Sequence, residues 1–135
     1  MSKFIKRIQK TVKKNISHCV VVGNDSDTID YIVSDFSTVF CLSWNTIPPR
    51  NKNIIPIQSI SFLQNLTDID IVFINQNFDE NVLQFLIPLS KICAPAILLN
   101  NNLVLSTEYI SFFNRIKYEQ VIVLDQYQVW KMIRK

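Results

Sequence analysis

The sequence predicts an α/β protein, a three-layer sandwich with a mostly parallel sheet and a C-terminal antiparallel β-hairpin. Short apolar runs rich in β-branched residues recur along the chain, as in strands that are covered on both faces. Helical patterns or loops separate the first five runs, whereas the last two runs are joined too closely for a crossover helix. The 135 residues, 48% of them apolar, suffice for one such domain.

The chain is expected to begin with a basic amphipathic helix over residues 3–15. Its apolar stripe consists of Phe4, Ile5, Ile8 and Val12. Six of the 14 Lys and Arg residues lie within the first fourteen positions, and no acidic residue precedes Asp25. Such a helix either contacts anionic lipid or nucleic acid, or packs its apolar stripe on the sheet and leaves its lysines in water.

A β-α-β unit is predicted to follow. HCVVVG (18–23) is typical of a buried strand, a helix capped by Asp25 or Ser26 extends to Phe36, and TVFCLSW (38–44) is the second strand. So short a connection favours a parallel pair with a right-handed crossover, which is a Rossmann-like arrangement. The expected organisation is a basic helix at 1–17 and a single Rossmann-like domain at 18–135.

The remaining elements are predicted in the same way. Paired prolines make residues 45–53 a surface loop, and Pro56 places the short strand 54–58 at a sheet edge. DIDIVFINQ (68–76) is the clearest central strand. The further elements are a helix at 80–93 that Pro88 should kink, a strand at 94–102, a helix at 107–116, and hairpin strands at 120–125 and 128–134.

Polar residues follow several of these strands at their carboxyl ends, where ligands bind in such sheets. The residues are Gly23 to Asp25, Trp44 and Asn45, Gln58 and Ser59, Asn75 to Asn77, and Asn100 to Asn102. The amides at 75–77 suit an uncharged ligand, although Asn is also common in turns that follow a strand. Asp25 either caps a helix or contacts a ligand, and Trp44 either stacks on an adenine ring or covers the core.

No pair of nucleophile and base is evident. His18, the one histidine, begins its strand, and Asp70 also lies at the amino end of the sheet, where it is expected to be solvated or to form a turn. One histidine without a CxxC motif gives too few ligands for zinc.

The cysteines and the apolar pattern bear on the compartment. Cys19, Cys41 and Cys93 lie far apart among apolar residues, as buried free thiols do. The chain shows neither a secretory signal nor about 20 consecutive apolar residues. A cytoplasmic protein is therefore expected.

The second half of the chain resembles the class I S-adenosylmethionine-dependent methyltransferases. DIDIVFINQNFDENVLQFLIPLSKICAPAILLNNN (68–102) and the closing hairpin EQVIVLDQYQVWKMIRK (119–135) match the order of elements in that family. In order of elements, the resemblance extends from about residue 18 to the end. It implies S-adenosylmethionine as the one cofactor to consider, and a cofactor site made of Gly23, Asn24, Asp25, Trp44, Asn75 and Gln76.

The chain departs from the family at these same positions. Family members usually carry GxGxG after the first strand, whereas here Gly23 is the only glycine of the protein. Trp44 stands where an acid usually accepts hydrogen bonds from the ribose, Asn75 replaces an Asp, and Asn100 to Asn102 replace further acids. Asp25 and Asp27 also put carboxylates where a pyrophosphate would bind, which disfavours a dinucleotide.

Three functions remain open. The departures favour a methyltransferase-like domain with an eroded cofactor motif that acts as a non-catalytic binding or assembly module, with a protein partner or a second copy. The first alternative is an active small methyltransferase, because methyl transfer relies largely on positioning. The second alternative is a receiver-like signalling domain, since VVVGNDSD and VFINQ loosely resemble response regulators, with Asn75 at the phosphoacceptor position.

Overall fold

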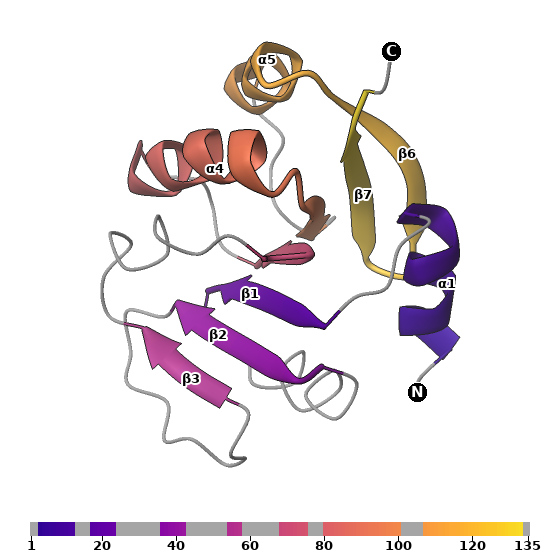
Figure 1. Cartoon of the computed structure of the whole chain (residues 1–135). Helices are drawn as coiled ribbons and strands as arrows, with labels where there is room; N and C mark the ends of the chain where they lie inside the picture. The colour runs from indigo at the N-terminus through magenta and orange to yellow at the C-terminus, as the bar shows by residue number, and fades with distance from the viewer. Residues whose placement is uncertain are drawn as a thin grey trace.

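The computed structural model describes residues 3–12, 17–23, 36–42, 54–57, 68–75, 80–100 and 107–133 (Figure 1). The helix expected after Asp25 and the loop at 45–53 lie outside these residues. The helices are α1 (Lys3–Val12), α4 (Glu80–Ile92) and α5 (Thr107–Arg115). The strands are β1 (His18–Val22), β2 (Thr38–Leu42), β3 (Ile54–Ile57), β4 (Ile71–Ile74), β5 (Ala96–Asn100), β6 (Tyr118–Leu124) and β7 (Tyr127–Met132).

The strands form one sheet in the order β3-β2-β1-β4-β5-β7-β6. The first five strands are parallel, and β7 pairs antiparallel with both β5 and β6. This confirms the mostly parallel Rossmann-like sheet with its terminal hairpin. A receiver domain has the order 2-1-3-4-5, so the receiver-like alternative is wrong.

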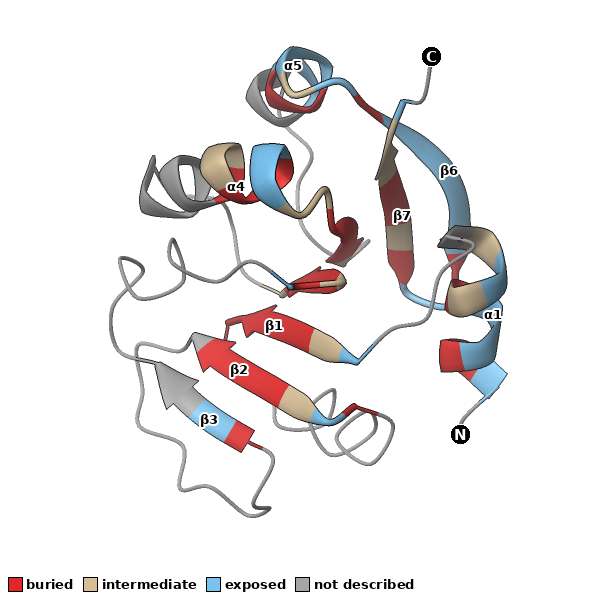
Figure 2. Ribbon diagram, in the orientation of Figure 1, coloured by how far each residue is buried: buried red, intermediate tan, exposed pale blue. Residues whose placement is uncertain are grey.

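Two hydrophobic clusters lie on opposite faces of the sheet, because side chains alternate along each strand. One face carries Val21 and Phe73 and is covered by α1, through Phe4, Ile5 and Ile8. The other face is covered by α4 and α5, through Leu86, Leu89, Phe112 and Phe113. Figure 2 shows the buried residues concentrated in β1, β2 and β7, between these helical layers. The predicted three layers are confirmed.

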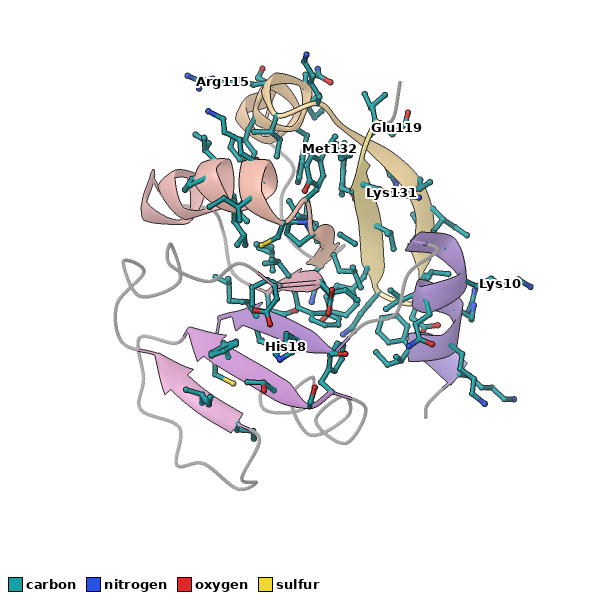
Figure 3. All side chains as sticks on the ribbon, viewed as in Figure 1. Lys10, His18, Arg115, Glu119, Lys131 and Met132 are labelled. Atoms are coloured by element: carbon teal, nitrogen blue, oxygen red, sulfur yellow. The ribbon has the colours of Figure 1, made fainter. Side chains whose placement is uncertain are left out.

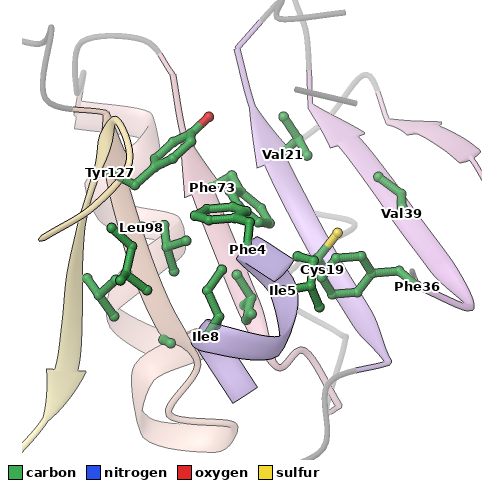
Figure 4. Packing of buried hydrophobic residues seen from close by; sticks show 14 of the residues in the cluster. Phe4, Ile5, Ile8, Cys19, Val21, Phe36, Val39, Phe73, Leu98 and Tyr127 are labelled. Carbon is green, nitrogen blue, oxygen red and sulfur yellow. The ribbon is translucent and has the colours of Figure 1, made fainter. Parts of the chain in front are cut away.

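Helix α1 packs its apolar stripe onto the sheet. Ile5 and Ile8 are completely buried, and the ring centroids of Phe4 and Tyr127 lie 6.0 Å apart (Figure 4). Arg7 adds an exposed ion pair with Asp125 at 3.8 Å, which links α1 to the turn of the hairpin. Lys3, Lys6 and Lys10 stay exposed. Of the two arrangements considered for this helix, the structure therefore contains the one in which the apolar stripe packs on the sheet and the basic face is exposed to solvent.

The described element boundaries differ from those expected by one to three residues at several points, including the starts of β4, β5 and β6. β4 begins at Ile71 instead of residue 68, although the backbone of Asp70 still bonds to His18 and Ala96 on the neighbouring strands. β6 begins at Tyr118, two residues early, because Tyr118 and Glu119 still pair with Met132 and Lys131 of β7. The Tyr118 hydroxyl also donates to the Pro95 carbonyl at 2.7 Å. Pro88 lies inside α4, and the kink there stays a prediction.

Among the helices that are described, none is long and apolar enough to cross a membrane.

Candidate functional site

The strand order reverses between β1 and β4, which is where ligands bind in sheets of this type. Gly23 follows β1 and Asn75 follows β4, so these two residues end the adjacent strands at the switch point. The backbone N–H of Asn75 donates to the Val22 carbonyl at 2.9 Å, which continues the hydrogen-bond ladder to the carboxyl ends of these two strands. Two of the six residues expected in a cofactor site are thus brought together.

Gly23 is buried and has a φ angle of 108°. The chain reaches positive φ at three other described residues, Ala94, Lys117 and Asp125, but their angles of 48° to 62° lie in or near the left-handed helical region. An angle of 108° lies outside that region, and a Cβ would be strongly disfavoured there. The backbone alone therefore accounts for the one glycine of the chain.

The side chain of Asn75 is held in a hydrogen-bond network. Its Oδ1 accepts from the Tyr127 hydroxyl at 2.7 Å and from Asn100 Nδ2 at 3.1 Å. An amide oxygen has two lone pairs, so both are used inside the protein. The network joins the carboxyl ends of β4 and β5 to the start of β7.

Asn75 Nδ2 is buried and has no hydrogen-bond partner among the residues that the structure describes. An unpaired buried N–H group of this kind costs about 1–3 kcal/mol. A flipped amide would set its nitrogen against Asn100 Nδ2, donor against donor, so Oδ1 is the atom that faces Asn100 and Tyr127. With Tyr127 as hydrogen donor to Oδ1, the group left for a ligand is a donor, which suits a carbonyl, hydroxyl or carboxylate oxygen but not a cation.

Sequence reasoning missed Tyr127 at this site. Its ring packs at 5.6 Å from the Phe73 ring and points its hydroxyl to Asn75, as Figure 4 shows for the two rings. A tyrosine at the start of the second hairpin strand is a weak signal by itself. It becomes informative only when β7 is known to pair with β5, where Tyr127 lies opposite Asn100.

Four other expected site residues, Asn24, Asp25, Trp44 and Gln76, lie outside the described residues. Within the described part, the parallel strands end in Val22 and Gly23, Leu42, Ile57, Ile74 and Asn75, and Asn100. None of these residues is acidic.

Among the described residues, the carboxylates of Asp68 and Asp70 lie at the amino ends of the strands. Asp70 Oδ2 accepts hydrogen bonds from the backbone N–H groups of Ser17 at 2.7 Å and His18 at 3.1 Å. Asp68 lies 3.7 Å from His18 Nδ1. Asp70 was expected to be solvated or to form a turn. Its carboxylate in addition binds the start of β1 and so joins it to the start of β4. His18 is half-buried at this edge, far along the strand from the switch point.

A cavity of about 400 Å³ lies elsewhere, between α4, α5 and the end of β7. Its lining includes Lys91, Arg115 and Lys117, with Ile87, Ser90, Ile116 and Met132; Figure 3 labels Arg115 and Met132. The three cations stand in or directly after the last turns of α4 and α5. Cations at that position stabilise the partial negative charge of a helix C-terminus, which accounts for their presence without a ligand.

Several solved structures with a similar fold are named as methyltransferases. A Sulfolobus solfataricus protein assigned as a type 11 methyltransferase has a TM-score of 0.69 at 12% identity, over 97% of this chain and 92% of its own. A Methanococcus maripaludis protein assigned as an S-adenosyl-L-methionine-dependent methyltransferase has a TM-score of 0.59 at 12% identity, over 98% and 85%. An Archaeoglobus fulgidus SAM-dependent methyltransferase has 0.61 at 13% identity, over 85% and 66%.

No family model and no curated protein matches the chain. The structural likeness therefore shows the fold, and the expected methyltransferase-like architecture is confirmed. At such identities, function has to be argued from the site itself.

The described residues of the site fit S-adenosylmethionine poorly. Gly23 is buried and carries no Cβ that would stand against a nucleoside. The sulfonium and amino groups of the cofactor are cationic and need acceptors, whereas the Asn75 oxygen is already bound twice and its free group is a donor. The described strand ends thus combine a permissive turn with the wrong polarity.

Proposed function

We propose that the chain is a methyltransferase-like domain with a weakened cofactor site, and that it acts as a non-catalytic binding or assembly module. The observation that carries this proposal is the Asn75 network. Where a cationic cofactor needs an acceptor, the acceptor is spent on Asn100 and Tyr127. The polar group has become part of the scaffold that joins β4, β5 and β7.

The lack of acids at the described strand ends supports the same conclusion. Ribose hydroxyls and the cofactor's amino group are bound best by carboxylates, which form shorter and stronger hydrogen bonds than amides. Among the described residues, Asp70 lies at the opposite edge of the sheet, where its carboxylate is engaged with the backbone of β1. The described strand ends thus offer a cofactor no carboxylate.

Isothermal titration calorimetry with S-adenosylmethionine and S-adenosylhomocysteine tests the proposal. We expect no saturable heat at micromolar protein concentrations. Binding with a Kd of about 1 μM, equivalent to about −8 kcal/mol, would contradict it.

An Asn75→Asp variant shows whether residue 75 is responsible. Its carboxylate can still accept from Tyr127 and Asn100 through one oxygen while the second oxygen faces the cofactor. We expect measurable binding in this variant. Asn114→Asp, on the exposed surface of α5, is the matched control, because it introduces the same charge away from the switch point.

An active small methyltransferase remains the second candidate function. The observation in its favour is the buried, unpartnered Asn75 Nδ2 beside the Gly23 turn in the described part of the chain, since such a donor is satisfied most simply by a ligand. Crystals soaked with S-adenosylmethionine would decide between the two. Density for a nucleoside over Gly23 would support the enzyme, and a turn closed by side chains would exclude it.

A further inference from the structure

The strand β6 forms one edge of the sheet and is unusually apolar on its exposed surface. Its five central residues, 119–123, are exposed, and only Tyr118 and Leu124 at its ends are buried. Val121, Ile122 and Val123 are 45%, 41% and 47% exposed. In Figure 2 the strand is pale blue over most of its length, beside the largely buried β7.

The two edges of the sheet differ in how they are protected against pairing. The other edge, β3, has four residues and contains Pro56, which removes a backbone donor. β6 has seven residues and no proline, and its one charged residue, Glu119, lies opposite Lys131 of β7 (Figure 3). An apolar edge of this length without proline is a template for another strand, and a β-bulge is the protective feature that it carries.

A β-bulge interrupts β6 between Gln120 and Ile122. Bulges increase the local twist, so pairing on the outer side is divided into two short segments. Most of the contact energy then has to come from burying Val121, Ile122 and Val123, and less from a continuous ladder of backbone hydrogen bonds.

The charges at the two ends of β6 indicate what covers it. Lys117 directly precedes the strand and Asp125 directly follows it, and both are exposed. In an antiparallel pair of two copies, Lys117 of each copy comes to the end that carries Asp125 of the other. A parallel pair would bring like charges together. The charges at the ends of β6 thus favour pairing of two copies in the antiparallel direction and disfavour the parallel one.

Both charges are available for such a contact. Lys117 forms no ion pair with any residue in the part of the chain that the structure describes. Asp125 faces Arg7 at 3.8 Å, but both side chains are more than half exposed, so a second cation can reach the carboxylate.

We propose that β6 is a homodimer interface, in which two copies of the chain pair antiparallel along this edge. Val121, Ile122 and Val123 form its apolar centre, and Lys117 and Asp125 form an ion pair at each end. The interface lies away from the switch point between β1 and β4, so it does not depend on whether a cofactor binds.

Sedimentation equilibrium over a range of concentrations tests the proposal. The wild-type chain is expected to dimerise, and Ile122→Lys to raise the dimer Kd by at least about 30-fold, as for the loss of a central contact. Ile55→Lys is the matched control, because Ile55 is 40% exposed on the opposite edge strand. We expect that control to dimerise as the wild type does.

A charge swap tests the direction of pairing. Lys117→Glu and Asp125→Lys are each expected to weaken the dimer, and the double variant to restore it. Circular dichroism checks that each variant is folded. A wild-type chain that is monomeric at about 100 μM would overturn the proposal, as would a dimer that Ile55→Lys weakens as much as Ile122→Lys does. So would a double variant whose dimer is weakened by the sum of the two single effects. A β6 edge that binds only another protein would also overturn it.

Discussion

The amide of Asn75 occupies a position where a carboxylate would serve a cationic ligand. Its oxygen holds two strands together, and its nitrogen is left without a partner among the described residues. A residue with one satisfied and one orphaned atom tells more about function than a fully satisfied one. The sequence placed Asn75 correctly at the end of β4, but only the contact with Tyr127 shows how its oxygen is used.

Tyr127→Phe removes the hydroxyl that donates to Asn75 and keeps the ring against Phe4 and Phe73. We expect the free energy of unfolding to fall by about 1 kcal/mol. Urea denaturation measures the loss. A double-mutant cycle with Asn75→Ala should show a coupling energy of at least about 0.5 kcal/mol, and full additivity would mean that the bond does not contribute.

Gly23→Ala places a Cβ on a buried residue whose φ is 108°. The expected loss of stability is about 1–3 kcal/mol, the usual range for a residue held in a disfavoured backbone conformation. Ala94→Gly is the control, because at a φ of 48° the gain from removing the Cβ is offset by added chain entropy. Thermal unfolding of both variants checks this, and a Gly23→Ala protein as stable as the wild type would refute the steric argument.

At the scale of elements, Asp70 joins three strands at their amino ends. Its carboxylate binds the backbone before and at the start of β1, its own N–H donates to the His18 carbonyl at 3.0 Å, and its carbonyl accepts from Ala96 at 3.0 Å. The sequence showed an acid at the opening of a strand. It could not show that the preceding residues of a distant strand would lie within reach.

Asp70→Ala leaves two backbone N–H groups without their acceptor. We expect it to reduce the free energy of unfolding by about 1–3 kcal/mol. Asp70→Asn keeps an acceptor oxygen without the charge and should lose less. Equal losses in the two variants, measured by urea denaturation, would show that the hydrogen bonds themselves are not the cause.

The packing of α1 is tested by one apolar and one charged substitution. Ile8→Ala removes a completely buried side chain and should reduce the free energy of unfolding by about 2–5 kcal/mol. Lys6→Gln, on the exposed face, should change it by less than about 0.5 kcal/mol. If Ile8→Ala were neutral while Lys6→Gln abolished retention on anionic vesicles, α1 would be a membrane-binding element first.

At the scale of the whole molecule, the burial of two thiols makes the free energy of unfolding depend on pH in the alkaline range. Burial raises the pKa of the Cys19 thiol well above 9.0, with smaller contributions from Cys41 and Asp70. Burial also raises the pKa of Cys41 from 9.0 to about 11. The thiols ionise first in the unfolded chain, so their contribution is complete below about pH 9 and is lost as pH rises towards the folded values.

Urea denaturation at about pH 8 and about pH 10 should therefore show a lower free energy of unfolding at the higher pH. Combining Cys19→Ala and Cys41→Ala should flatten this dependence. Tyr118, whose pKa is raised by burial and secondarily by Cys93, adds a further loss at still higher pH. A wild-type stability that increased over this range would contradict the assignment.

The arrangement of the sheet was predictable because its physics is local: apolar β-branched runs, short crossovers and a tight final turn. The order of the two hairpin strands was not predictable. VIVL in β6 is more apolar than YQVW in β7, which favours β6 as the inner strand. The structure shows instead that β7 pairs with β5. The contact of Tyr127 with Asn75 depends on that strand order, so this contact could not be predicted from the sequence.

The helix nearest the N-terminus rests against the last hairpin, through Phe4 with Tyr127 and Arg7 with Asp125. During synthesis α1 leaves the ribosome well before that hairpin, and its docking surface is completed only several seconds later, at elongation rates of about 20 residues per second. Until then its apolar stripe lacks the part of its native cover that Tyr127 provides. A nascent chain stalled before residue 127 should therefore hold α1 incompletely docked and within reach of chaperones.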